Sequence, residues 1–148
     1  MLSVYPSGVQ AAFIWRSNFV RQVFLLFSHQ LTPAQMDELE NKYKVDKIVH
    51  LPAGLQELWS NIPPELPTIK DHLQDVLIWL KENSNPGDLV LVQGEFGAVY
   101  IVVNFCIKEG LVPIYATTKR EASEEILGDG TVQVRRKFSH VRFREFEM

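Results

Sequence analysis

Cysteine and long apolar runs are the two features that this sequence has least of. The chain has one cysteine, Cys106, which excludes an internal disulfide and a zinc site built from thiolates. No stretch reaches the roughly 18 apolar residues that a membrane-spanning helix needs, because Asn104 and Lys108 interrupt the longest candidate. A chain without disulfides or a membrane span fits the reducing cytoplasm, which is the compartment we expect.

Metal-ligand spacings and cofactor fingerprints are also missing. His50 and His72 have no partner at a spacing that would hold a metal, and no pair of carboxylates marks a two-metal site. Arg135 and His140 have the Arg-x4-His spacing found in helical ribonuclease domains, but their odd separation puts them on opposite faces of an extended strand. We therefore expect chemistry without a metal or a cofactor.

Length, apolar content and charge together fit one globular domain. The 148 residues are 46% hydrophobic and carry a formal net charge of −3. Residues 1–21 lack the basic start of a secretory signal, and we interpret them as an extension of uncertain order before a single domain over residues 22–148. Seven of the fifteen Lys and Arg residues fall within the last 32 positions, which indicates a local anionic partner despite the mildly acidic total.

Apolar runs and helical spacings alternate along the chain. The continuous apolar runs that predict buried strands cover residues 23–27, 47–51, 89–92 and 112–115. The segments that predict helices begin at the capping box Thr32–Gln35, run from Leu55 to Ile62, run from Ile69 to about Glu82, and cover residues 95–109. This alternation is the order of an open, mainly parallel α/β sheet with right-handed crossovers and flanking helices.

The end of the sequence predicts a C-terminal β-hairpin. Gly128-Asp129-Gly130 separates two extended stretches. In such a hairpin, Glu124 and Glu125 would face Arg135 and Arg136 across the two strands.

The predicted helix over residues 95–109 is apolar on nearly all sides. Such a helix must be covered on every side. We therefore expect it either to lie at the centre of the domain or to pack against a second subunit.

Three polar motifs follow predicted strands at their carboxyl ends. They are Ser28-His29-Gln30, Gln93-Gly94-Glu95-Phe96-Gly97 and Thr117-Thr118-Lys119-Arg120. The carboxyl ends of parallel strands meet at one edge of a sheet, so this topology allows the motifs to converge on one ligand crevice. Gly94 and Gly97 bracket a helix start, whose free N–H groups suit a phosphate, while Lys119 and Arg120 add positive charge.

Each motif also has a purely structural interpretation. Glycines at strand-to-helix turns are usually structural, and Gly94 and Gly97 match neither the dinucleotide fingerprint nor the Lys-bearing phosphate loop. In that interpretation Ser28 ends a strand, His29 is a solvated loop residue, and residues 117–120 form a solvated turn. Composition and spacing leave both interpretations open.

Taken together, the separated motifs resemble a small Csx-type family of CRISPR-associated proteins. The segments that carry the resemblance are Phe24-Leu25-Leu26-Phe27-Ser28-His29-Gln30-Leu31-Thr32, Leu58-Trp59-Ser60-Asn61-Ile62-Pro63, Val92-Gln93-Gly94-Glu95-Phe96-Gly97, Tyr115-Ala116-Thr117-Thr118-Lys119-Arg120-Glu121 and Phe138-Ser139-His140-Val141-Arg142-Phe143-Arg144-Glu145. They occur in the same order over residues 23–146, which makes the resemblance more specific than any one motif.

The resemblance implies a Rossmann-like domain of the CRISPR-associated (CARF-like) kind that acts in antiviral defence. The implied activity is that of a ring nuclease, which degrades the second messenger cyclic oligoadenylate, above all cyclic tetra-adenylate, without a metal. An adenosine 2′-hydroxyl attacks the neighbouring phosphate, and the linear products end in a 2′,3′-cyclic phosphate. Relatives of this kind are homodimers that bind the ring across the two-fold axis, and neither a membrane nor DNA is implied as a partner.

The resemblance also implies a role for each site residue. Lys119 and Arg120 would stabilise the charge on the phosphorane, Ser28 would orient the phosphate or ribose, and His29 would act as general base or acid. The residues that would bind the ring are Gln30, Gln93, Gly94, Glu95, Phe96, Gly97, Thr117 and Thr118. The alternative is a non-catalytic sensor or sponge, which would have the same fold and binding residues but would hold the ring without cutting it.

Overall fold

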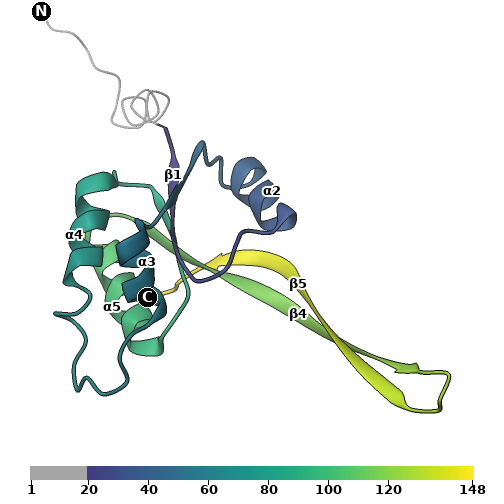
Figure 1. Ribbon diagram of the computed structural model, residues 1–148. Helices are drawn as coiled ribbons and strands as arrows, with labels where there is room; N and C mark the ends of the chain where they lie inside the picture. The colour runs from purple at the N-terminus through teal and green to yellow at the C-terminus, as the bar shows by residue number, and fades with distance from the viewer. Residues whose placement is uncertain (1–19) are drawn as a thin grey trace, which may run out of the picture.

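The strands of this protein form one five-stranded sheet, seen here in a computed structural model that describes residues 20–148. The expected extension over residues 1–21 therefore lies almost wholly outside the described residues. The strands are β1 (Gln22–Leu26), β2 (Lys47–His50), β3 (Leu89–Val92), β4 (Val112–Ile126) and β5 (Val132–Glu145). Their order is β2-β1-β3-β4-β5, and β5 is antiparallel to β4 while the other pairs are parallel (Figure 1). The predicted open, mainly parallel α/β sheet is confirmed.

The two central strands, β1 and β3, consist almost entirely of apolar residues. Residues 23–26 pair in parallel register with residues 89–92, and all of these residues are buried. Strands that are buried on both faces are apolar throughout rather than alternating. This is why the sequence predicts both strands to within a residue.

Four helices connect the strands, and most of their bounds agree with the sequence pattern. They are α2 (Pro33–Asn41), α3 (Ala53–Ser60), α4 (Gln74–Asn83) and α5 (Phe96–Lys108). The capping box of α2 is confirmed, because Thr32 and Gln35 each accept the backbone N–H of the other with their side chains. Among the described residues, no helix is long and apolar enough to cross a membrane.

Helix α4 begins later than the sequence predicts. The apolar spacing from Ile69 onward is helical, but residues 70–73 form turns and the helix starts at Gln74. The N–H of Leu73 nevertheless donates to the carbonyl oxygen of Ile69 at 3.0 Å. One such turn brings Ile69 and Leu73 to the same side as a helix would, so the spacing alone does not distinguish the two structures.

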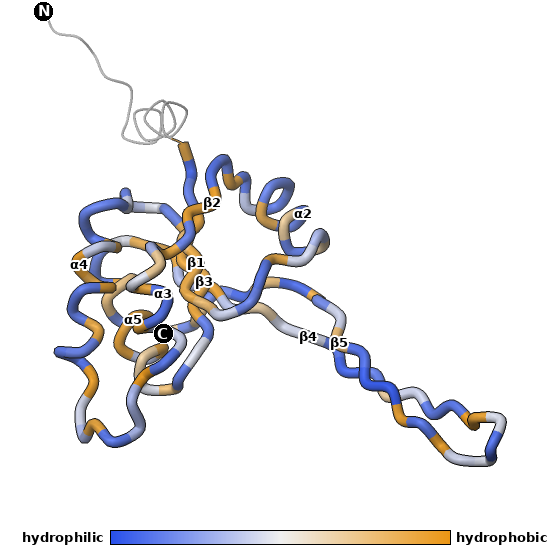
Figure 2. Tube along the Cα trace, viewed as in Figure 1, coloured by the Kyte–Doolittle hydropathy of each residue, from blue (hydrophilic) through white to orange (hydrophobic). Residues whose placement is uncertain are grey.

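Helices cover both faces of the sheet. The side chains of Phe24, Leu26, Val90 and Val92 pack against α3, α4 and α5, whereas those of Val23, Leu25, Leu89 and Leu91 pack on the side of α2. Successive residues of a strand point to opposite faces, so β1 and β3 contribute to both halves of the core. The hydropathy colouring shows the same central apolar strands (Figure 2).

Helix α5 buries one side against the sheet and keeps another side uncovered. Ala98, Val102 and Cys106 are completely buried, but Phe96 and Tyr100 are 94% and 72% exposed. Of the two placements that the sequence allows for this apolar helix, the central one is therefore wrong. Contact with a second subunit stays a prediction.

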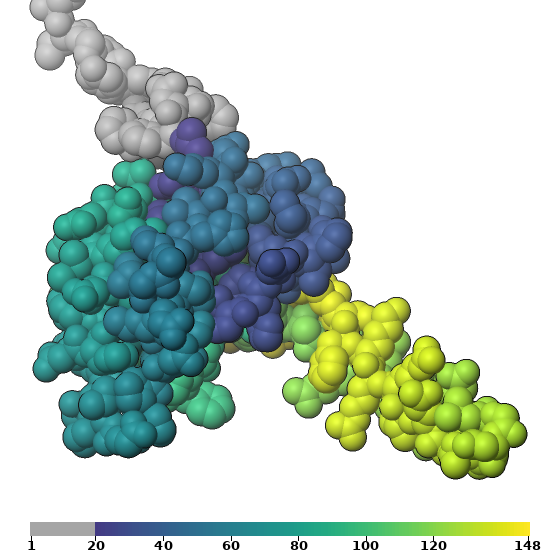
Figure 3. Space-filling model, in the orientation of Figure 1, coloured from purple at the N-terminus to yellow at the C-terminus, as the bar shows by residue number. Residues whose placement is uncertain are grey.

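Strands β4 and β5 continue beyond the rest of the sheet as a long hairpin (Figures 1 and 3). We call residues 118–140 the arm. Its base is marked by a shift of register, since Thr117 pairs with Arg142 but Thr118 pairs with His140. The predicted hairpin is confirmed, but the predicted strand over 112–115 is too short, and residues 117–120 continue the strand instead of forming a turn. Polar residues continue a strand here because a second strand satisfies their backbone groups.

The expected charge pairing across the hairpin is correct in one pair only. Glu125 and Arg135 form an ion pair at 3.4 Å, and both are largely exposed. Glu124 instead lies opposite Val134, and Arg136 lies opposite Ala122. The turn length sets the register, and the sequence pattern does not resolve it to one residue.

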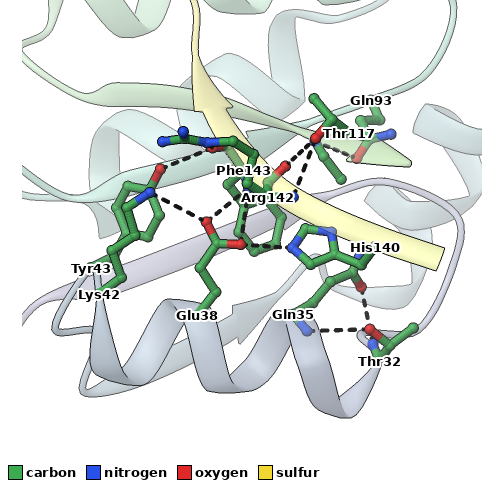
Figure 4. Close-up of polar contacts among 11 residues, drawn as sticks. Thr32, Gln35, Glu38, Lys42, Tyr43, Gln93, Thr117, His140, Arg142 and Phe143 are labelled. Atoms are coloured by element: carbon green, nitrogen blue, oxygen red, sulfur yellow. Dashed lines mark hydrogen bonds and ion pairs between the residues drawn. The ribbon is translucent and has the colours of Figure 1, made fainter. Parts of the chain in front are cut away.

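A buried polar cluster fastens the base of the arm to helix α2 (Figure 4). The Glu38 carboxylate accepts the backbone N–H of Phe143 at 2.9 Å and lies 2.7 Å from Nε2 of His140. The side chain of His140 is only 5% exposed, whereas that of Arg135 is 68% exposed. The Arg-x4-His pair therefore does not form a joint site, as the strand geometry predicts.

Candidate functional site

The crevice that this topology favours lies beyond the carboxyl ends of β1 and β3. Strand β1 leads into α2 on one face of the sheet, and its neighbour β3 leads into α5 on the other face. Sheets of this strand order bind their ligands at the point where the connections diverge in this way. The segments that follow the two strands are residues 28–30 and 93–97, which are two of the three predicted polar motifs. The structure thus brings these two motifs together.

The segment after β1 is exposed and has few contacts. Ser28, His29 and Gln30 are all exposed. The hydroxyl of Ser28 lies 2.8 Å from the hydroxyl of Ser60, and the ring of His29 lies edge-on to Phe27 at 6.3 Å between centroids. The His29 imidazole is therefore exposed to a ligand at this position, whereas the Ser28 hydroxyl is already bonded to Ser60.

Helix α3 supports the crevice, and sequence reasoning did not assign its residues to the site. Trp59 donates its indole N–H to the carbonyl oxygen of Gln93 at 3.0 Å, and Gln56 donates to the carbonyl of Phe27 at 3.1 Å and to the hydroxyl of Ser60 at 2.9 Å. The end of α3 therefore bonds to both strand-end segments. The motif Leu58-Trp59-Ser60-Asn61 could have indicated these residues, because it is part of the resemblance. Sequence reasoning gave it no role.

Gln93 and Gly94 hold the end of β3 in place. The Gln93 side-chain oxygen accepts the N–H of Ala116 at 3.2 Å, which extends the link from β3 to β4 beyond their ladder. A Cβ on Gly94 would come within 3.1 Å of the Trp59 indole. Any larger residue would press against the tryptophan, so Gly94 has a packing role that agrees with its structural interpretation.

The start of helix α5 is capped by its own chain. The carboxylate of Glu95 accepts the N–H of Gly97 at 2.9 Å and the N–H of Ala98 at 3.0 Å. The expected phosphate contact with free N–H groups at this helix start therefore requires that the carboxylate first move aside. This capping role of Glu95 is common for an acidic residue at a helix N-terminus.

The third motif, residues 117–120, leads away from the crevice along the base of the arm. The Thr117 hydroxyl donates to the carbonyl oxygen of Arg142 at 2.7 Å, and Thr118 is exposed. At about 3.3 Å per residue, Lys119 lies roughly 7 Å beyond Thr117. The Lys119 ammonium forms an ion pair with Glu121 at 3.3 Å.

Lys119 and Arg120 point to opposite faces of the arm, because they are neighbours in one strand. Tyr115 packs with Phe146 on the α5 side of the sheet, so alternation places Thr117 and Lys119 on that side too. The Arg120 guanidinium instead lies 5.6 Å from the ring centre of Phe138 on the other face. We predicted that the two cations would meet at one phosphate. Within one chain, their opposite directions prevent this.

An exposed aromatic ring lies beside the crevice. Phe96 is the first residue of α5, follows the β3 segment directly, and has 94% of its surface exposed. An aromatic ring so exposed offers a flat apolar surface on which a planar group can stack. Among residues 20–148, no group of three His, Cys, Asp or Glu side chains is arranged to hold a metal ion.

The fold defines an α/β protein with a mostly parallel, five-stranded sheet and a switch point between β1 and β3. Comparison with known proteins places the chain in a family. Residues 21–144 match the family described as "Uncharacterized protein MJ1673 family", and the chain belongs to it. It is similar to the protein named "Uncharacterized protein MJ1673" from Methanocaldococcus jannaschii, with 48% identity over 125 residues that cover 84% of this chain and 96% of the relative. No solved structure matches.

Proposed function

We propose that this protein is a CARF-like ring nuclease that binds cyclic tetra-adenylate at the switch-point crevice and cuts it without a metal. The observation that carries the proposal is the position of residues 28–30 and 93–97 on the two sides of the β1/β3 switch point. These segments are also two of the motifs on which the resemblance to Csx-type proteins rests. Position in the fold and resemblance are independent, and both select the same residues.

Binding of the ring uses stacking and polar contacts in this proposal. One adenine stacks on Phe96, which is worth about 1–3 kcal/mol for a base on an aromatic ring. Gln93 offers its side-chain amide N–H groups, since its amide oxygen is already bonded to Ala116. Gly94 lets the ligand approach the backbone closely. Ser28 and Gln30 meet the phosphate or ribose from the other side of the crevice.

Cleavage is an internal transfer on one phosphate. The adenosine 2′-oxygen forms a bond to phosphorus while the bond from phosphorus to the 5′-oxygen breaks, which leaves a 2′,3′-cyclic phosphate and a 5′-hydroxyl. His29 takes the proton from the 2′-hydroxyl, and the departing 5′-oxygen takes a proton from water. The ring lies beside Phe96 at the start of α5, and Lys119 points to the α5 side of the sheet. Lys119 therefore stabilises the added negative charge of the phosphorane.

A homodimer completes the proposal. A cyclic oligoadenylate with repeated adenosines suits a two-fold symmetric pair of crevices, because identical residues of both chains then meet identical groups. The uncovered face of α5 and the projecting arm are surfaces that a second copy has to cover.

A sponge that holds the ring without cutting it is the second candidate. The observation that favours it is the pairing of Lys119 with Glu121 at 3.3 Å, since a paired ammonium contributes less to a developing charge. In this function the crevice contacts are the same, and His29 takes no proton.

An affinity titration tests the site. A 2′-O-methyl analogue of cyclic tetra-adenylate lacks the attacking hydroxyl, so binding is measured without turnover. We expect Phe96→Ala to weaken binding by about tenfold, as the loss of one stacked base predicts. Ile107→Ala is the matched control, because Ile107 is also exposed on α5 but lies at its far end. Equal affinity of the Phe96→Ala variant and the control would reject this position of the ring.

A further inference from the structure

Two apolar surfaces of this chain are uncovered, and they lie on different parts of the molecule. One is a groove of about 700 Å³ between α4 and α5, which we call the outer groove. Apolar and aromatic side chains such as Ile78, Ile101 and Tyr100 line it together with charged and amide side chains. The other is one face of the arm, which projects away from the helices (Figure 3).

The arm has one apolar face and one polar face. Residues directly opposite each other on paired strands share a face, so Arg120 with Phe138, Glu124 with Val134, and Ile126 with Val132 lie on one side. Among them, the apolar residues Ile126, Val132, Val134 and Phe138 are 54–77% exposed. The opposite face carries Lys119, Glu121, Ser123, Glu125, Gln133, Arg135, Lys137 and Ser139.

A two-stranded hairpin on its own is marginally stable in water. The arm extends over eight residue pairs from Lys119 with Ser139 to Ile126 with Val132, and nothing in residues 20–148 covers its apolar face. An amphipathic ribbon of this kind requires a partner surface for its apolar side.

Three of the four charged residues that line the outer groove are lysines, whereas the distal part of the arm is acidic. Lys70, Lys81 and Lys108 line the outer groove, and Lys81 is 3.9 Å from Glu109. The distal part of the arm carries Glu124 on the apolar face and Asp129 in the turn. The pKa of Asp129 is lowered because the hydroxyl and N–H of Thr131 donate to its carboxylate, so it is ionised at neutral pH. Arg120 and Arg136 lie on the same face but nearer the base.

We propose that the apolar face of the arm docks into the outer groove of a second copy of this chain. The arm points away from its own groove, so the contact forms between chains, and a two-fold pair makes it twice (Figure 1). In the contact, Ile126, Val132 and Val134 cover Tyr100 and Ile101, and the acidic tip lies among the groove lysines. This inference specifies the contact of the homodimer in the proposed function, and it does not depend on ring cleavage.

The docked arm has a consequence for the crevices. The arm leaves the sheet at the carboxyl end of β4, which is the edge that carries the crevice. A second copy held by this arm therefore lies beyond the edge of the sheet that carries residues 28–30 and 93–97.

Cross-linking with a short bismaleimide tests the contact in the full-length chain. Val132→Cys places a thiol on the apolar face of the arm, and Asn104→Cys places one in the outer groove. The native Cys106 is buried and its pKa is raised to about 12 by desolvation, so it stays unreactive. We expect a covalent dimer when the two variants are mixed, and no dimer from either variant alone.

Gln133→Cys is the matched control, because residue 133 lies on the polar face of the same strand. It should give no cross-link with Asn104→Cys. A dimer from Val132→Cys alone would show that arms pair with each other, and the absence of any heterotypic product would show that the groove is not the partner. Either result would overturn the proposal.

Sedimentation equilibrium provides a second measurement that does not depend on linker geometry. We expect Val132→Asp to raise the dimer dissociation constant by about tenfold or more, and Gln133→Asp to leave it unchanged. Val132 is 56% exposed, so the variant retains its fold, which circular dichroism checks. A wild-type chain that sediments as a monomer, or a Val132→Asp variant that dimerises like the wild type, would contradict the proposal.

Discussion

The indole N–H of Trp59 donates a hydrogen bond to the carbonyl oxygen of Gln93, 3.0 Å away, and so joins the end of α3 to the end of β3. The side chain of Gln93 continues the connection to β4 through the N–H of Ala116. Three elements that border the crevice are thus fixed to one another by two side chains. The position of the β3 segment depends on packing behind the crevice as much as on the residues that face it.

Gly94→Ala tests this packing. A Cβ at this position lies 3.1 Å from the indole of Trp59, so the ring has to move and the free energy of unfolding should fall by about 1–3 kcal/mol, as for overpacked positions. Urea denaturation measures the change. Gly54→Ala is the control, because nothing lies within 4 Å of a Cβ there and alanine favours a helix. An unchanged stability of Gly94→Ala would show that Trp59 does not constrain residue 94.

Glu95→Ser tests whether the capping carboxylate competes with a phosphate. Serine also caps a helix, so the stability of α5 should change by less than about 1 kcal/mol, whereas Glu95→Ala should lose about that amount. Removal of the negative charge beside the crevice should strengthen binding of the 2′-O-methyl ring in the serine variant. Weaker binding by Glu95→Ser would instead show that the carboxylate itself contacts the ring.

Lys119→Ala separates transition-state stabilisation from binding. If Lys119 acts on the phosphorane, the cleavage rate should fall by about 100-fold while the affinity for the ring changes little. Lys137→Ala is the matched control, because Lys137 lies on the same face of the arm farther from the crevice. Equal losses of rate and affinity would make Lys119 a binding residue. Neither variant should change stability, because Lys119 is largely exposed.

Glu38→Ala tests the attachment of the arm to α2. The substitution leaves the N–H of Phe143 and the buried ring of His140 without their shared acceptor, so the free energy of unfolding should fall by about 2–4 kcal/mol. Glu40→Ala, which changes an exposed residue of the same helix, should have an effect below about 0.5 kcal/mol. Thermal denaturation of the two variants gives the comparison, and equal midpoints would show that the cluster does not stabilise the fold.

The single thiol supplies a pH-dependent prediction. Burial raises the pKa of Cys106 from its ordinary value of 9.0 to about 12. The folded state thus keeps the proton that the unfolded state loses above pH 9, so this contribution to stability is complete below pH 9 and falls as the pH rises toward 12. At pH 8 the folded protein should react with a thiol reagent only as fast as it unfolds. Fast labelling without denaturant would show that Cys106 is accessible.

The sheet and the positions of its central strands could be predicted from the sequence, because burial on both faces leaves a simple apolar run. The capping box of α2 could also be predicted, because Thr32 and Gln35 are close in the sequence and each accepts the backbone N–H of the other. The length of β4 depends on a segment that is distant in the sequence. Residues 117–120 are polar and look like a turn, and only pairing with β5 makes them a strand.

The sequence predicted that two of the polar motifs follow neighbouring strands, but it did not predict their contacts. Residues 28–30 and 93–97 follow adjacent strands, and topology alone brings them together. Three facts required the three-dimensional structure: the capping role of Glu95, the support from Trp59, and the opposite directions of Lys119 and Arg120. The first two depend on contacts that no spacing encodes, and the third depends on the strand continuing through residue 120.

Product analysis tests the central claim most directly. The purified protein is incubated with cyclic tetra-adenylate in excess chelator, and the products are resolved by liquid chromatography and mass spectrometry. The account predicts linear products that end in a 2′,3′-cyclic phosphate and a 5′-hydroxyl, at a rate that Lys119→Ala lowers. An intact ring that co-elutes with the protein would make it a sponge, and an intact ring that does not bind would contradict the account.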